Sequence, residues 1–151
     1  MTDLRILIDG DACNVITKVE TVAAKHDIET HIYCDTSRVI TSEVSIVHIV
    51  DTAPDSTDFA IIRQCRKHDI IITADTGLAS MAMSLGAIVL NPKGFKYTQQ
   101  NINSYLTSRH LRQRAVRQTG RKQVATSPIQ TKRTNFTKLL TTTIDRIKKE
   151  T

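Results

Sequence analysis

The sequence predicts an α/β protein in which helices cover both faces of a mostly parallel sheet, giving three α/β/α layers. Three observations lead to this prediction. Short β-prone segments alternate with segments of helical periodicity along roughly the first 90 residues. The β-prone segments are continuous apolar runs, which is typical of parallel strands that are buried on both faces. A length of 151 residues with 40% hydrophobic residues suits one compact domain with a sizeable core.

Five segments are predicted to be strands. The sequences LRILI and DIIIT are the clearest, because they are short, apolar and rich in β-branched isoleucine. The fifth segment, AIVL, is ended by NPKG, whose proline and glycine break a strand. The predicted strands cover residues 4–8, 29–34, 44–50, 69–73 and 87–90.

Helices are predicted between and after these strands. Residues 14–27, 55–68 and 76–86 place apolar side chains at helical spacing, and Gly86 ends the last of them. A long helix is expected from about Thr98 to Gln118, so that residues 1–118 form the α/β domain. Residues 119–134 lack periodicity and are predicted to be a basic linker. Residues 135–151 are expected to carry a C-terminal helix, over 135–149, that docks on the same domain.

Charge is distributed unevenly along the chain. Residues 1–103 contain 9 Lys+Arg and 13 Asp+Glu, a balance of −4, whereas residues 104–151 contain 12 and 2, a balance of +10. A basic region of this kind either binds phosphate or is a solvated tail. With few aromatic residues to stack on bases, a nucleic acid would be held by its backbone. The candidate contacts are Arg109, Arg112, Arg114, Arg117, Arg121 and Lys122.

The composition also excludes several classes of protein. The sequence has no run of 18 or more apolar residues, so it predicts no membrane span, and the N-terminus lacks the pattern of a signal peptide. We therefore expect a cytoplasmic protein without a membrane partner. Three widely spaced cysteines and no C-x-x-C argue against a disulfide framework or a zinc site.

Aspartates come after the first, third and fourth predicted strands, at what should be one edge of the sheet. Asp9 and Asp11 end the first strand, Asp75 follows the fourth, and Asp55 and Asp58 open a helix. Ligands of parallel sheets bind beyond the carboxyl ends of the strands. Helix capping is the alternative explanation for Asp11, Asp55 and Asp75, but it does not explain Asp9 directly after a buried strand.

We therefore predict a site for Mg²⁺ or Mn²⁺ on these five carboxylates, because hard divalent cations prefer oxygen ligands and relieve carboxylate repulsion. Asp69 opens the fourth strand and should lie at the opposite edge, so it is excluded. The remaining acidic residues left out of the site are Asp3, Asp27, Asp35 and Asp51.

Several motifs together resemble one bacterial protein family. ILIDGDAC, PDSTDFAII, DIIITADTGLA, LNPKGFKYTQQNI and RQTGRK occur in the order seen in the YaiI/YqxD family. That family resembles PIN-like domains, the fold of many metal-dependent ribonucleases. The resemblance implies a PIN-like α/β/α fold and an acidic Mg²⁺ or Mn²⁺ site, which falls on Asp9, Asp11, Asp55, Asp58 and Asp75.

Three functions compete at this point. The leading hypothesis is a metal-dependent nuclease acting on RNA, with Asp9, Asp11, Asp58 and Asp75 as its catalytic residues. Asp9, Asp58 and Asp75 would hold the metal, while Asp11 and Asp55 would complete the shell or orient water. The second hypothesis is a non-catalytic module that binds nucleic acid or protein. The third is a phosphatase of the haloacid dehalogenase type, which also has Asp-x-Asp after its first strand.

Overall fold

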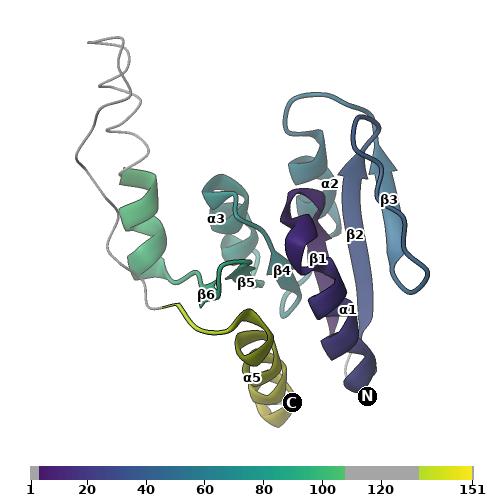
Figure 1. Cartoon of the computed structure of the whole chain (residues 1–151). Helices are drawn as coiled ribbons and strands as arrows, with labels where there is room; N and C mark the ends of the chain where they lie inside the picture. The colour runs from purple at the N-terminus through teal and green to yellow at the C-terminus, as the bar shows by residue number, and fades with distance from the viewer. Residues whose placement is uncertain (1–3, 108–132, 151) are drawn as a thin grey trace.

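The structure is a computed structural model that describes residues 4–107 and 133–150 (Figure 1). Within these residues, one sheet has six strands in the order β3-β2-β1-β4-β5-β6. The strands are β1 (Arg5–Asp9), β2 (Glu29–Asp35), β3 (Ile46–Val50), β4 (Ile70–Ile72), β5 (Ile88–Asn91) and β6 (Phe95–Lys96). Neighbours from β3 to β5 pair in parallel, as the sequence predicted.

Burial explains why β1 and β4 form the centre of the sheet. All five residues of β1 and all three isoleucines of β4 are buried, so both faces of these strands need covering. Ile6 of β1 pairs with Thr30 of β2 on one side and with Ile70 of β4 on the other. Such strands cannot face water on either side, which requires a helical layer on each face.

The helices form these two layers. They are the 3-10 helix η1 (Gly10–Val15) and the α-helices α1 (Ile16–Lys25), α2 (Ser56–Gln64), α3 (Thr76–Ser84) and α5 (Phe136–Glu150), and residues 99–107 are also helical. Apolar residues of α1 and α5 pack against one face of the sheet, and those of α2, α3 and 99–107 pack against the other. Helices α1 and α5 lie side by side in Figure 1. The three-layer prediction is confirmed.

Several element boundaries differ from the prediction. The first helix begins with a 3-10 segment at Gly10, four residues before the predicted start at residue 14. Helix α2 ends at Gln64, and the short antiparallel strand β6 was not predicted. Of the predicted helix 98–118, residues 99–107 are helical and the remainder lies outside the described residues. Most of the predicted linker, residues 119–134, also lies outside them.

No helix in the described parts of the chain combines the length and the apolar character needed to cross a membrane.

Candidate functional site

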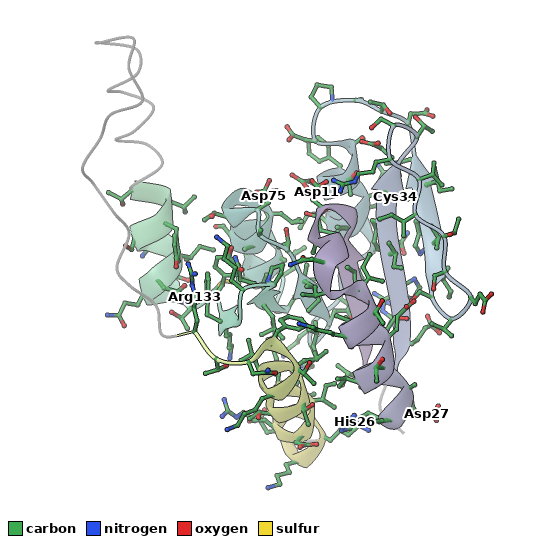
Figure 2. All side chains as sticks on the ribbon, viewed as in Figure 1. Asp11, His26, Asp27, Cys34, Asp75 and Arg133 are labelled. Carbon is green, nitrogen blue, oxygen red and sulfur yellow. The ribbon has the colours of Figure 1, made fainter. Side chains whose placement is uncertain are left out.

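The carboxyl ends of β1, β2 and β4 meet at one edge of the sheet because these strands run parallel. Asp9 ends β1 and Asp35 ends β2, while Asp75 lies beyond β4, directly before α3. Figure 2 shows Asp11 and Asp75 at this end of the molecule and Asp27 at the other end. The parallel sheet thus brings together carboxylates that are far apart in the sequence.

Asp9 is the most buried of the five predicted carboxylates, with an exposed fraction of 4%. Its Oδ2 accepts a hydrogen bond of 2.8 Å from the Thr73 hydroxyl, and its Oδ1 accepts the backbone N–H of Asp11 at 3.3 Å. Burial raises the pKa of Asp9, and these two hydrogen bonds oppose that rise. The charges of Asp11 and Asp75 raise the pKa further.

Thr73 connects the two segments that carry Asp9 and Asp75. Its side chain is fully buried, and its Oγ1 also accepts the backbone N–H of Asp75 at 3.0 Å. Asp75 Oδ1 in turn accepts the backbone N–H of Leu78 at 3.0 Å and so caps α3. The sequence analysis did not identify Thr73, although a polar residue directly after DIII and two before Asp75 was a visible signal.

Asp58 lies half-buried in the first turn of α2. Burial raises the pKa of Asp58 to about 6, and the charges of Asp75, Asp9, Asp55 and Asp11 add to this rise. Burial is the largest cause of that shift, and repulsion contributes because each neighbouring carboxylate disfavours ionisation of Asp58. Carboxylates from three separate segments therefore act on one side chain.

The capping alternatives have different outcomes. Asp75 does cap α3, so part of its role is structural. Asp55 occupies the N-cap position of α2 with φ of 60° but makes no cap hydrogen bond through its side chain. Asp11 is not the cap of the first helix, because Asp9 is the N-cap of η1 and accepts the Asp11 N–H. Capping therefore accounts for Asp75 and, contrary to the prediction, for part of the role of Asp9, and it leaves Asp11 and Asp55 unexplained.

A pocket of about 100 Å³ opens beside Asp9 and Asp11, at the ends of β1 and β2. We call it the β1–β2 pocket, and it is lined by Asp9, Gly10, Asp11, Tyr33, Cys34, Asp35, Ser37, Arg38 and Thr57. Gly10 is required here by close packing, since a Cβ atom at this position would lie 2.6 Å from the backbone oxygen of Tyr33. The glycine of the DGDAC motif therefore lets η1 approach β2.

The sequence analysis missed the part of the β1–β2 pocket that lies at the end of β2, namely Asp35, Ser37 and Arg38. Asp35, which was left out of the carboxylate set, lies in the same pocket as Asp9 and Asp11. The Ser37 hydroxyl donates to Asp35 and lowers the pKa of this carboxyl group. Arg38 Nη1 lies 4.0 Å from Asp11 Oδ1, and both side chains are exposed. The strand-end rule that selected Asp9 applies equally to Asp35, which ends β2, and would have found it.

Asp69 lies at the opposite edge of the sheet, as predicted. It forms a buried ion pair with Arg5, whose Nη2 is 2.6 Å from Asp69 Oδ2 and whose Nε donates to Oδ1 at 3.2 Å. The carboxylate also accepts the backbone N–H of Arg66 at 2.9 Å. Because both of its oxygens are bonded in this way, Asp69 stabilises the fold at the amino ends of β1 and β4.

The chemistry of the donors at the carboxyl edge fits a hard divalent cation, because every candidate ligand is a carboxylate oxygen. Within the described residues, however, no group of three or more His, Cys, Asp or Glu side chains is arranged to hold a metal ion. The metal site on Asp9, Asp11, Asp55, Asp58 and Asp75 stays a prediction. The six basic candidates, Arg109, Arg112, Arg114, Arg117, Arg121 and Lys122, lie outside the described residues.

Comparison with known proteins identifies the family. The family model described as "Uncharacterized BCR, YaiI/YqxD family" matches residues 7–146, which include all five predicted carboxylates and most of α5. The chain belongs to the YaiI/YqxD family. The resemblance seen in the sequence motifs is thereby confirmed.

Curated relatives of this YaiI/YqxD protein support the same conclusion. A "UPF0178 protein" of Clostridium kluyveri is 40% identical over 117 residues, covering 78% of this chain and 76% of the relative. One from Clostridium acetobutylicum is 36% identical over 114 residues, covering 76% and 77%. One from Lachnoclostridium phytofermentans is 40% identical over 108 residues, covering 72% of each chain. No solved structure matches the chain.

Proposed function

We propose that this YaiI/YqxD protein is a PIN-like nuclease that depends on Mg²⁺ or Mn²⁺ and acts on RNA. The observation that supports this proposal most is the raised pKa of Asp58, about 6, to which burial contributes most and the repulsion of four other aspartates adds. A bound divalent cation would remove this repulsion. Perturbed acids grouped at a strand edge are also typical of catalytic sites.

In this proposal Asp9, Asp58 and Asp75 hold the cation, while Asp11 and Asp55 complete the site or orient water. A cation bound here would activate water and stabilise negative charge on a phosphoryl oxygen. Thr73 favours the ionised form of Asp9 by donating to Oδ2, and ionised carboxylate is the form that binds cations. The same hydroxyl fixes Asp75 relative to Asp9 by accepting the Asp75 N–H.

RNA would be held chiefly through its phosphate backbone. Residues 104–151, with a charge balance of +10, provide the positive charge. Residues 1–103, which include the five carboxylates, have a balance of −4. Basic side chains that neutralise phosphates release counterions, which makes binding depend on salt but not on sequence. Binding and cleavage are thus assigned to different parts of the chain.

The test is cleavage of single-stranded RNA by the purified full chain with Mn²⁺, compared with Asp9→Asn and Asp75→Asn. Each substitution should abolish cleavage and leave RNA binding nearly intact, because asparagine keeps the shape of aspartate but loses its charge. Asparagine also caps helices as well as aspartate does, so α3 should keep its N-terminus in Asp75→Asn.

Asp27→Asn is the matched control. Asp27 lies at the opposite end of the sheet with φ of 57°, a conformation that asparagine adopts readily. Cleavage that survives both site substitutions would identify a contaminating nuclease. No cleavage of RNA or DNA by the parent protein across a broad pH range would instead favour the binding-module hypothesis.

A further inference from the structure

The edge strand β3 presents backbone groups that no other strand of the described sheet bonds. Strand β3 lies at one end of the strand order, with β2 on its inner side. The N–H of Thr36 donates to the carbonyl of Val50 at 3.0 Å, so the backbone of Val50 faces β2. Because backbone groups alternate in direction along a strand, those of Val47 and Ile49 face outward.

The same strand exposes apolar side chains. The exposed fraction is 47% for Ile46 and 52% for Ile49, and the strand IVHIV contains no Lys, Arg, Asp or Glu. The opposite edge of the sheet is different, because β6 has only two residues and one of them is an exposed lysine, Lys96. Short edges with lysine resist pairing, whereas longer apolar edges invite it. Only the β3 edge of this sheet therefore has the character of a pairing surface.

We propose that β3 pairs antiparallel with β3 of a second copy of this chain, about a two-fold axis at His48, so that the two sheets become one. This proposal concerns the assembly and does not depend on the nuclease function.

The register at His48 fits the outward-facing groups. Val47 and Ile49 of the partner subunit would exchange both of their backbone hydrogen bonds, and the two-fold axis repeats this pair on the other side. Ile46 would lie opposite Val50 of the partner subunit. Every apolar residue of β3 then faces an apolar residue across the interface, which stabilises an antiparallel pair.

Shifting the axis by one residue loses this match. An axis at Ile49 would place Val47 opposite Asp51 of the partner subunit, and an axis at Val47 would place Ile49 opposite Ser45 of the partner subunit. The pattern of apolar residues thus selects the axis at His48, by the same logic that fixes register in other sheets.

The side chain of His48 is compatible with a position on the axis. Its ring stacks on Tyr33 with centroids 4.5 Å apart, and its Nε2 hydrogen-bonds His31 Nδ1 at 2.8 Å, so the ring is held within its own subunit. Burial and the charges of His31 and Arg5 lower the pKa of His48 below its usual value of 6.5. The neutral form of each His48 ring is therefore favoured at pH 7, which limits charge repulsion between two rings at the axis.

The symmetry also explains why association would stop at two copies. A two-fold interface uses the same patch on both subunits, and the outer edges of the joined sheet would be the short β6 strands. The axis reverses the strand direction of the second sheet, so the two carboxyl edges point in opposite directions. Each candidate site is then complete within one chain, and loss of the dimer should leave any activity unchanged.

Sedimentation velocity of the full chain over a range of concentrations tests the proposal. The parent should be a dimer at tens of micromolar, and Ile49→Lys should raise the dimer Kd at least about tenfold, because a charge at an edge opposes pairing. The matched control is Leu85→Lys, which changes an apolar side chain of similar exposure (45%) after α3 and should leave the dimer intact. Circular dichroism confirms that each variant is folded.

A second variant tests the register directly. Opposed residues of a non-hydrogen-bonded pair have Cα atoms about 4.5 Å apart, within disulfide range. His48→Cys should therefore form a disulfide-linked dimer under mild oxidation, whereas the parent with its three native cysteines should not. A parent that stays monomeric at all concentrations, an Ile49→Lys variant that dimerises normally, or a His48→Cys variant that does not cross-link would each overturn the proposal. A monomeric parent would mean that another partner or no partner covers β3.

Discussion

The hydroxyl of Thr73 donates a hydrogen bond of 2.8 Å to Asp9 Oδ2 in the buried interior of the carboxyl edge. The hydroxyl oxygen of Thr73 also accepts the backbone N–H of Asp75. Thr73→Val, which keeps the shape of the side chain, should therefore lower the free energy of unfolding by about 1–3 kcal/mol, because it leaves a buried acceptor and a donor without partners. Urea denaturation at pH 7 measures this change.

Thr73→Ser is the control for this prediction. Serine keeps the hydroxyl and loses one methyl group, so its cost should be about 1 kcal/mol, the usual contribution of a buried methyl group. If the valine variant were as stable as the parent, Thr73 would not hold the two aspartates together.

Asp58 gives a prediction that depends on pH. Its folded-state pKa of about 6 lies above the reference value of 3.8, so the folded protein binds more protons than the unfolded chain between these values. The contribution of Asp58 to the stability of the metal-free protein should fall as pH rises from about 4 to about 6, and the full cost should be present above that range. At pH 7 in EDTA, Asp58→Asn should be more stable than the parent by about 1 kcal/mol, a value reduced for partial solvent exposure.

Thermal unfolding of both proteins from pH 4 to pH 8 provides the measurement. The advantage of Asp58→Asn should disappear near pH 4, where the parent carboxyl group is protonated in both states. Asp51→Asn removes one carboxylate at an exposed position after β3 and controls for a general effect of net charge. A constant difference at all pH values would show that the ionisation of Asp58 is not its cause.

The parts of the fold that the sequence predicted are those that local pattern determines. The short apolar segments of β1 and β4, rich in β-branched isoleucine, predicted buried strands, and the strand-end rule then placed Asp9 and Asp75 at one edge. Strand β6 was missed because its two residues pair with β5 only after a turn at Gly94, where φ is 104°. A two-residue strand has no periodicity for a sequence pattern to reveal.

The details of the candidate site depend on neighbours across the sheet. The role of Thr73 arises from hydrogen bonds to residues on two different segments, and one of these, Asp9, lies 64 positions away in the sequence. The N-cap of the first helical segment is Asp9 rather than Asp11, because the chain turns into a 3-10 helix at Gly10. The sequence shows that Thr73 is a polar residue at the end of a buried strand, but its partner across the sheet follows only from the packed structure.

The basic region gives a prediction about nucleic-acid binding. Replacing Arg112, Arg114 and Arg117 with glutamine should weaken RNA binding for all sequences and flatten the dependence of log K on log salt by about one for each lost phosphate contact. The reason is that six of the 12 Lys and Arg residues of 104–151 lie within residues 109–122, which contain no Asp or Glu. Fluorescence anisotropy across a salt titration measures the slope, and the same change at Lys138, Arg146 and Lys149 of α5 is the control. An unchanged slope would assign the three arginines to solubility or to the fold.

The last prediction concerns the metal itself. If the carboxylates bind Mn²⁺ only in the folded state, the metal should stabilise the protein by about 2.7 kcal/mol at one hundred times Kd. Asp9→Asn should lose most of this gain, because Asp9 is the most buried of the five carboxylates. In EDTA the same variant should have about the stability of the parent. It no longer buries a charge, but its single amide oxygen can accept only one of the two hydrogen bonds that Asp9 accepts from Thr73 and from the Asp11 N–H. Thermal melts with and without Mn²⁺ measure both effects, and Asp27→Asn should respond to the metal as the parent does. Equal melting temperatures of the parent with and without millimolar Mn²⁺ would remove the metal from the proposed function.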